Sequence, residues 1–205
     1  MKNKVGLAFV LLIIVVFCSA CGYRIKHQNA PGELIVCFGD SITLGYGAER
    51  QEAYPVILEK ILKVPVINAG IDSDTTTEAL KRVGSDVLGR NPRLVVIEMG
   101  NNDFLRRVPL EITLNNMRAI VDRIQEKKIM VAIMDISLGI VLDEYKTEYY
   151  KIAKEKGAIF IPSVMGEIIT TPSLKSDTIH PNAKGYRMIA EKTAQVLRPY
   201  LKARK

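Results

Sequence analysis

Hydrophobic residues gather in short continuous runs, and stretches with helical periodicity separate these runs. Runs that are apolar at every position and rich in β-branched residues are typical of strands covered on both faces of a sheet. The stretches between them place apolar residues at i, i+3, i+4, i+7 and i+8, as residues 54–62 and 110–124 do, which predicts amphipathic helices. The predicted strands cover residues 34–38, 64–68, 94–98, 129–134 and 158–161.

Three more stretches predict helices, at residues 75–88, at residues 143–156 and from Asn182 to about residue 201. Asn182 has a side chain suited to an N-cap, and Gly157 stands where a helix-ending glycine belongs. Strand and helix alternate five times, which predicts an α/β domain whose parallel sheet carries helices on both faces. Ligands of such sheets bind at the carboxyl ends of the strands, so the residues that follow each strand are the candidates for a functional site.

The N-terminal residues follow the pattern of a secretory signal. A short basic segment (residues 1–4) precedes an almost unbroken apolar run (residues 5–17), and small residues follow it. Ser19-Ala20-Cys21 resembles the bacterial lipoprotein signal, in which the cysteine becomes lipid-modified and N-terminal after cleavage. We therefore expect a signal peptide over residues 1–20, a lipid anchor on Cys21, a tether over residues 21–33 and one domain over residues 34–205.

The expected location is the bacterial cell envelope, with a membrane-anchored domain that faces the periplasm or the exterior. Cys18 is less suited to lipidation, because bulky Phe17 precedes it. An uncleaved membrane anchor and a plainly secreted protein are the two alternatives.

The composition is that of a globular domain. The 205 residues are 48% hydrophobic and 25% charged, which provides a sizeable core and excludes a largely disordered or collagen-like chain. The formal net charge is +7 at pH 7, but acidic residues interrupt the basic clusters, and no zinc-finger, KH or RRM pattern is present. We expect a solvated basic surface and no nucleic-acid partner, with weak attraction to anionic lipid headgroups as the alternative.

The scarce cysteine and histidine residues limit the chemistry. Three Cys and two His are too scattered for a four-ligand zinc site, and no metal or other cofactor is expected. Cys37 lies in the apolar run 34–38 and is expected to be a small buried hydrophobe. His27 lies in the expected tether, close to Cys21, so a histidine-dependent reaction would have to use His180.

Polar blocks occupy the positions where a site is expected. Gly39-Asp40-Ser41 follows the first strand, where Gly39 permits a tight turn that displays Ser41 at the strand end. Residues 68–77 form a polar loop after the second strand, and Gly100-Asn101-Asn102-Asp103 places two side-chain amides after the third. Each block alone is just as common in turns and helix caps, so its meaning depends on the others.

The last block, Asp177-Thr178-Ile179-His180-Pro181, pairs a carboxylate with an imidazole. A carboxylate three residues before a histidine can share a tight turn with it, fix its tautomer and stabilise the imidazolium ion. Pro181 favours an extended conformation at His180, just before the last helix. His180 is therefore expected in a loop, where functional groups collect.

In this order the four blocks resemble the SGNH/GDSL hydrolase superfamily, and the resemblance covers residues 34–201. It implies a nucleophile, Ser41, with Asp177 and His180 as its triad partners. It also implies an oxyanion hole made by the backbone N–H groups of Ser41 and Ser73 and by the side-chain amide of Asn102. Ser73 stands where the family usually has glycine; it keeps the N–H but is strained if the position needs a positive φ.

Within the superfamily the chain is most similar to the small bacterial secreted branch of acyl-CoA thioesterases, arylesterases and lysophospholipases, with which it shares its compact length and Tyr54-Pro55. The resemblance implies a three-layer, flavodoxin-like α/β fold with a five-stranded parallel sheet. The implied enzyme is a carboxylic ester hydrolase that needs no cofactor. It would cleave esters or thioesters of short to medium acyl chains, lysophospholipids among them, through an acyl-serine intermediate.

Two other functions stay open at this point. A polysaccharide O-acetyl esterase would use the same machinery, because loops that the sequence does not define shape the pocket. Four apolar candidates for the lining favour an acyl chain over an acetyl group: Ile71, Phe104, Leu105 and Ile140. A non-catalytic, membrane-anchored binding lipoprotein that retains the fold is an alternative of another class, and the intact Ser41, Asp177 and His180 argue against it.

Overall fold

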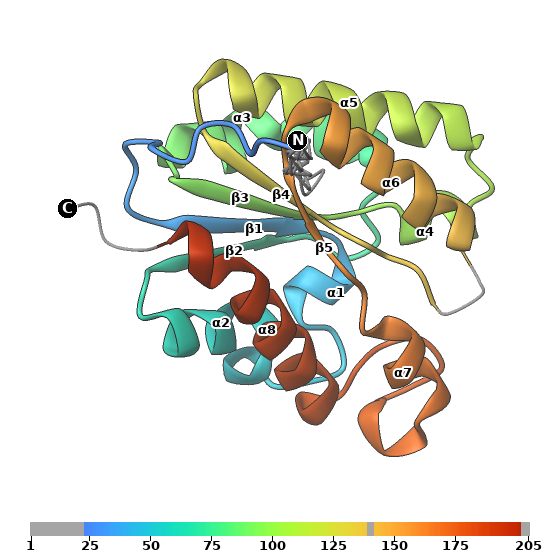
Figure 1. Ribbon diagram of the computed structural model, residues 1–205. Coiled ribbons are helices and arrows are strands. Elements are labelled where there is room, and N and C mark those ends of the chain that lie inside the picture. The colour runs from blue at the N-terminus through green and yellow to red at the C-terminus, as the bar shows by residue number, and fades with distance from the viewer. Residues whose placement is uncertain (1–22, 139–141, 202–205) are drawn as a thin grey trace, which may run out of the picture.

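The computed structural model describes residues 23–138 and 142–201 (Figure 1). The expected signal peptide over residues 1–20, the expected lipidation site Cys21 and the pocket candidate Ile140 lie outside the described residues. Within them, no helix has the length and apolar character needed to cross a membrane.

The central strands are buried at every position, as their continuous apolar runs predict. They are β1 (Ile35–Gly39), β3 (Leu94–Glu98) and β4 (Met130–Met134). The edge strands β2 (Val66–Gly70) and β5 (Ile159–Ile161) complete a five-stranded parallel sheet in the order β2-β1-β3-β4-β5. The predicted five-stranded parallel sheet is confirmed.

Helices cover both faces of the sheet, which makes the predicted three-layer α/β fold (Figure 1). One face carries α3 (Thr76–Asp86), α5 (Leu110–Glu126) and α6 (Asp143–Lys156). The opposite face carries α2 (Tyr54–Leu62) and α8 (Ala183–Leu197).

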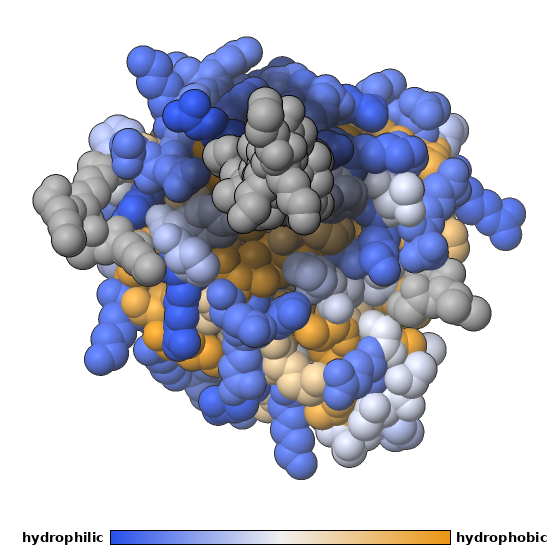
Figure 2. Space-filling view, viewed as in Figure 1, coloured by the Kyte–Doolittle hydropathy of each residue, from blue (hydrophilic) through white to orange (hydrophobic). Residues whose placement is uncertain are grey.

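Successive residues of a strand enter the two cores alternately, because their side chains point to opposite faces of the sheet. In β1, Val36 and Phe38 pack beneath α3 and α5, whereas Ile35 and Cys37 pack against α2 and α8. Cys37 is fully buried, as expected, and burial raises the pKa of its thiol to about 12. Outside the cores the surface is mostly hydrophilic on the face drawn in Figure 2.

Proline explains two boundaries that differ from the prediction. β2 begins at Val66 rather than at residue 64, and Pro65 contributes only a carbonyl, which accepts the Ile35 N–H at 2.9 Å. α8 ends at Leu197, and the chain continues as a 3₁₀ turn, Arg198–Tyr200, because Pro199 cannot donate to an α-helix. Other elements follow the prediction closely.

The predicted helix ends are confirmed where a capping residue is present. The Asn182 side chain accepts hydrogen bonds from the Lys184 and Gly185 N–H groups at the start of α8. Gly157 ends α6 in the left-handed conformation, with φ at 65°.

The sequence analysis missed some short helices, and the first two of them carry residues of the expected site. They are α1 (Ser41–Leu44), α4 (Asn101–Leu105) and α7 (Met165–Thr170). One or two turns are too short to show a hydrophobic period, so no pattern could reveal them. Because α1 follows β1 directly and α4 starts beyond the end of β3, both place their first residues at the carboxyl edge of the sheet (Figure 1).

Gly39 is required for a different reason from the tight turn that we predicted. Its φ is not among the positive values of the described residues. A Cβ at this position would collide with the Thr43 side chain and lie 2.5 Å from the Glu98 carbonyl oxygen. Glycine therefore allows α1 and β3 to approach the end of β1 closely.

The described part of the expected tether, residues 23–33, lies along the domain instead of extending away from it. The Lys26 N–H donates to the Gly157 carbonyl at 2.9 Å, and the Tyr23 ring packs edge-on against Tyr150. Ile25 packs against the core beneath α8. Gly157 lies just before β5, so the Lys26 contact falls at the edge where the strands begin, opposite the carboxyl edge of the sheet.

Candidate active site

A hydrogen-bonded relay joins three of the predicted site residues at the carboxyl edge of the sheet. Ser41 Oγ lies 3.1 Å from His180 Nε2, and His180 Nδ1 lies 2.7 Å from Asp177 Oδ2. Ser41 and His180 are 139 positions apart in the chain. The fold thus brings together the nucleophile, the base and the carboxylate that the sequence predicted.

Local capping holds Ser41 at the end of β1. The Asp40 side chain accepts the Ile42 N–H at 3.0 Å and so caps α1. Gly45 ends this single turn with φ at 97°, a conformation that glycine adopts without strain. Ser41 is 7% exposed, and it lines the same cavity as His180.

A compact turn orients His180. Asp177 Oδ1 accepts the backbone N–H groups of Ile179 at 2.9 Å and His180 at 2.8 Å, while Oδ2 faces the imidazole. Partial burial favours the neutral acid, but the backbone and imidazole hydrogen bonds outweigh it and lower the pKa of Asp177 to about 2. Asp177 is therefore a carboxylate at any pH at which an ester hydrolase works. The Tyr46 ring, which the sequence analysis did not single out, packs against the imidazole with ring centroids 4.5 Å apart.

A buried pair of carboxyl groups lies beneath the nucleophile and was not predicted. Asp40 is fully buried, Glu98 at the end of β3 is nearly so, and their side chains hydrogen-bond each other. Burial, followed by the charge of Glu98, raises the pKa of Asp40 well above its usual value, and burial also raises the pKa of Glu98. Each carboxyl group of the pair therefore holds its proton to a higher pH than it would in water. The only sign of this pair in the sequence was Glu98, an acidic residue at the end of an otherwise apolar strand.

Asn102 lies beside the nucleophile but is already engaged. Its Nδ2 donates to the Asp74 carbonyl at 3.0 Å and lies 3.3 Å from Asp40 Oδ2. Asn102 lines the same cavity as Ser41 and His180. Its amide is therefore close to the reacting groups, and its role in an oxyanion hole stays a prediction.

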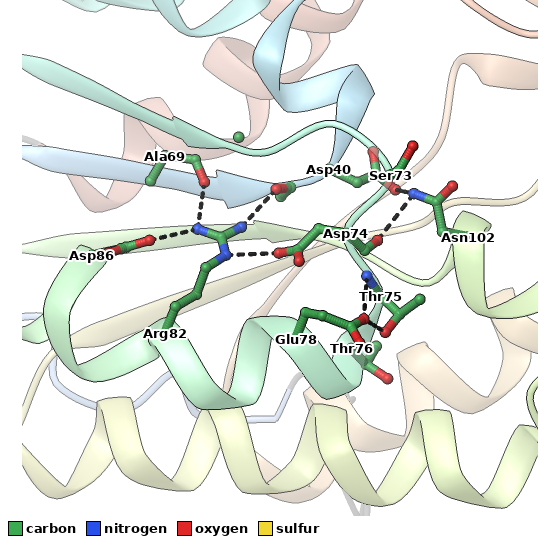
Figure 3. A network of polar contacts seen from close by, with 12 residues as sticks. Asp40, Ala69, Ser73, Asp74, Thr75, Thr76, Glu78, Arg82, Asp86 and Asn102 are labelled. Carbon is green, nitrogen blue, oxygen red and sulfur yellow. Dashed lines mark hydrogen bonds and ion pairs between the residues drawn. The ribbon is translucent and has the colours of Figure 1, made fainter.

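Ser73 has the backbone conformation that the sequence analysis flagged as strained. Its φ is 62°, in the left-handed region that favours glycine. Ser73 is exposed and is not among the residues that line the cavity, but the next residue, Asp74, bonds to Asn102 through its carbonyl (Figure 3). The structure thus places Ser73 next to the site, and its N–H as an oxyanion donor stays a prediction.

The cavity beside Ser41 has polar and apolar lining. Its polar lining residues are Ser41, Asn101, Asn102 and His180. Phe104 and Leu105 line the cavity, as expected. Ile71 was also expected there, but it is not among the lining residues. The other apolar lining residues come from α1, the β4–α6 connection, α7 and the last block: Ile42, Leu138, Leu142, Met165 and Ile179.

The part of the chain that the structure describes has no set of side chains that could bind a metal ion together. Within residues 23–138 and 142–201, no three His, Cys, Asp or Glu side chains are grouped so that they could hold a metal ion. The arrangement around Ser41 is instead suited to nucleophilic catalysis with a general base.

Known proteins are similar to this chain in sequence and in fold. Thioesterase 1/protease 1/lysophospholipase L1 of Escherichia coli (strain K12) is 29% identical over 201 residues, which cover 94% of this chain and 92% of that protein. The crystal structure of the psychrotrophic esterase EstA from Pseudoalteromonas sp., inhibited by monoethylphosphonate, is 26% identical and covers 82% of this chain and 98% of its own, with a TM-score of 0.74. The uncharacterized lipoprotein YqeF of Bacillus subtilis (strain 168) is 34% identical over 103 residues, which cover 46% of this chain and 38% of that protein.

A family profile gives the assignment. The profile of the GDSL-like Lipase/Acylhydrolase family matches residues 37–188, which is well over half of the chain and includes Ser41, Asn102, Asp177 and His180. The resemblance stated from the four polar blocks is confirmed. With its three-layer fold and its Ser-His-Asp relay, the chain belongs to the GDSL-like lipase/acylhydrolase family.

Proposed function

We propose that this hydrolase cleaves carboxylic esters or thioesters of short to medium acyl chains through an acyl-serine intermediate. One observation carries the proposal: the Ser41–His180–Asp177 relay opens into a cavity whose lining is mostly apolar. A serine hydroxyl is a weak nucleophile at neutral pH, and a hydrogen-bonded imidazole activates it.

The reaction has two halves that use the same groups. Ser41 Oγ attacks the acyl carbonyl while His180 Nε2 takes the hydroxyl proton, and the resulting imidazolium returns the proton to the departing alcohol or thiol. Water then repeats the attack on the acyl-serine, with His180 again as the base. Asp177 keeps its negative charge throughout and stabilises the imidazolium.

The negative oxygen of each tetrahedral intermediate needs hydrogen-bond donors. We assign this role to the backbone N–H groups of Ser41 and Ser73 and to the Asn102 amide. A single donor of this kind is worth about 3–4 kcal/mol of transition-state stabilisation. The Asn102 contact with Asp40, at 3.3 Å, is the longer of its two and is the one that an oxyanion would replace.

The apolar lining supports an acyl substrate rather than an acetylated sugar. Phe104, Leu105 and Leu138 offer an alkyl chain contact and no hydrogen-bond partners for a pyranose ring. Burying each methylene of the chain there contributes about 0.8 kcal/mol. We therefore place the preferred acyl group above acetyl in length.

A fluorophosphonate probe and an ester series test this function. The probe should label the wild-type protein and Ser85→Ala, which changes an exposed serine of α3, but not Ser41→Ala. p-Nitrophenyl esters from acetyl to dodecanoyl should give a maximum between butanoyl and decanoyl. A maximum at acetyl would favour a polysaccharide O-acetyl esterase, and a folded wild-type protein that takes no label would favour a binding lipoprotein.

We also propose that the protein is a bacterial envelope lipoprotein anchored through Cys21. Ser19-Ala20-Cys21 supports this, and so does the similarity to a relative that is named a lipoprotein. The described chain starts at Tyr23, which packs against Tyr150 of α6, and continues along the edge where the strands begin. Basic side chains line a hollow at that same edge, where they would lie near anionic headgroups: Arg24, Lys26 and Lys128.

A further inference from the structure

Arg82 on α3 gathers an unusual number of polar contacts for a residue outside the four blocks. Its Nε donates to Asp74 Oδ2 at 2.7 Å, and its Nη1 donates to the Ala69 carbonyl and to Asp86 Oδ2, each at 3.0 Å. Its Nη2 donates to the Gly39 carbonyl at 3.0 Å. The Arg82 side chain is 13% exposed, and its guanidinium lies over the Phe38 ring.

These contacts join the two loops on which the reaction depends. Gly39 is the last residue of β1 and immediately precedes Asp40 and the nucleophile. Ala69 lies near the end of β2, from which the chain passes into the loop of Ser73. The Gly39 carbonyl also accepts the Ile71 N–H at 3.1 Å, so it links that loop to the nucleophile block directly.

Ser73 itself is held in a costly backbone conformation. A non-glycine residue at a φ of 62° is less stable there than in the right-handed region, and it stays only when its neighbours are fixed. The residue that follows is fixed twice, because Arg82 binds the Asp74 carboxylate and Asn102 binds the Asp74 carbonyl. The Asp74 side chain is 6% exposed, so few other groups compete for it.

We propose that Arg82 is a positioning residue that acts through Asp74 to hold Ser73 in the left-handed conformation and to aim its backbone N–H at the oxyanion hole. This inference rests on the proposed function, in which that N–H is a donor. Lysine cannot replace Arg82, because one ammonium group cannot reach Asp74, Ala69 and Gly39 together, whereas the planar guanidinium offers five donors.

The test is a double-mutant cycle between positions 82 and 73, with kcat and KM measured on a p-nitrophenyl ester. Arg82→Lys should lower kcat about tenfold with little change in KM, since the strain of a left-handed residue is no longer offset. In the Ser73→Gly background the same change should cost less than about threefold, because glycine holds a positive φ without help. Equal losses in both backgrounds would overturn the proposal.

A matched control distinguishes a positioning role of Arg82 from the general effect of losing an arginine contact to α3. Arg123, an exposed residue of α5, donates to the Leu80 carbonyl of the same helix α3 at 2.9 Å but does not reach either loop. Arg123→Lys should leave kcat unchanged. If Arg82→Lys does not fold, as judged by circular dichroism, Asp74→Asn takes its place in the cycle, because it removes the charge partner and leaves the Arg82 carbonyl contacts intact.

The outcome also distinguishes this inference from the function on which it rests. If Ser41→Ala keeps its esterase activity, the proposed acyl-serine mechanism fails. If Ser41→Ala is inactive but Ser73→Gly does not relieve the loss caused by Arg82→Lys, the mechanism stands and the positioning role of Arg82 fails.

Discussion

Asp177 binds His180 twice, once through the imidazole Nδ1 at 2.7 Å and once through the backbone N–H at 2.8 Å. Different carboxylate oxygens make the two contacts, and the Ile179 N–H shares the oxygen that holds the backbone. The two residues therefore form a unit whose geometry is set within one turn. Only Ser41 has to be brought to this unit by the rest of the fold.

Asp177→Asn should reverse the hydrogen-bonding direction at His180. The amide oxygen would stay on the two backbone N–H groups, which leaves its NH₂ facing Nδ1. Nδ1 would then accept, Nε2 would carry the proton, and His180 could no longer take the Ser41 proton. We expect kcat to fall by about 10²–10⁴, in line with the effect of the wrong tautomer in serine proteases.

Asp72→Asn is the control for this change. Because Asp72 is exposed on a different loop from Asp177, this variant should keep full activity. Because the pKa of Asp177 is about 2, its carboxylate keeps its charge above about pH 4, and the fall in kcat of the wild type at acidic pH should not come from Asp177. Activity of Asp177→Asn within threefold of the wild type would contradict the assigned role.

Asn102→Ala removes a proposed oxyanion donor. We expect a loss of about 10²–10³ in kcat with a small change in KM, because the donor acts on charge that develops only in the transition state. Asn101→Ala is the matched control, since Asn101 is the preceding residue of α4 and gives its amide to Glu98 instead. Comparable losses in both variants would indicate that α4 as a whole had moved.

Leu138→Trp should shorten the preferred acyl chain. Leu138 belongs to the apolar lining, and an indole there would occupy space that an alkyl chain fills. Two or more excluded methylenes should lower the ratio of octanoyl to acetyl ester turnover by about tenfold or more. Ile112→Trp, on the exposed side of α5, should leave the ratio as it is. An unchanged ratio in Leu138→Trp would place the acyl chain elsewhere.

Asp40→Asn should reduce the pH dependence of stability. Because burial raises the pKa of Asp40, the folded state releases the proton of this carboxyl group at a higher pH than the unfolded state, in which the pKa is about 3.8. The free energy of unfolding therefore falls as the pH rises from about 3.8 through the raised pKa of Asp40. Asparagine keeps the oxygen that caps α1 but has no proton to lose. Unfolding by urea at pH 5 and pH 8 measures the difference.

For this comparison the surface variant Asp143→Asn should behave like the wild type, because Asp143 is 65% exposed. The same decline in the free energy of unfolding between the two pH values in Asp40→Asn and in the wild type would rule out the raised pKa of Asp40.

Cys21→Ala should release the protein from membranes. A lipid on Cys21 would be the attachment, and alanine cannot carry it. Cys18→Ala is the control and should remain in the membrane fraction, because Cys18 is removed with the signal peptide. Mass spectrometry of membrane-bound wild-type protein should find a lipid on Cys21; an unmodified Cys21 in that fraction would refute the anchor.

The elements and the catalytic pair could be predicted because short-range interactions determine them. The strands appear as continuous apolar runs, and the long helices as a period of 3.6 residues, since both patterns repeat within one element. The Asp177–His180 unit also lies within four residues, as does the Asn182 cap. The sequence by itself therefore determined the fold class and the three residues that the structure joins in one hydrogen-bonded relay.

Contacts between distant segments decided the rest. Arg82 reaches the Gly39 carbonyl across 43 positions, and Asp40 meets Glu98 only because β1 and β3 pair side by side. The docking of residues 23–33 depends on the same kind of packing. No local pattern encodes such contacts, because a charged or strained residue becomes favourable only when its remote partners compensate it. Tertiary structure alone decided how the site is held in place.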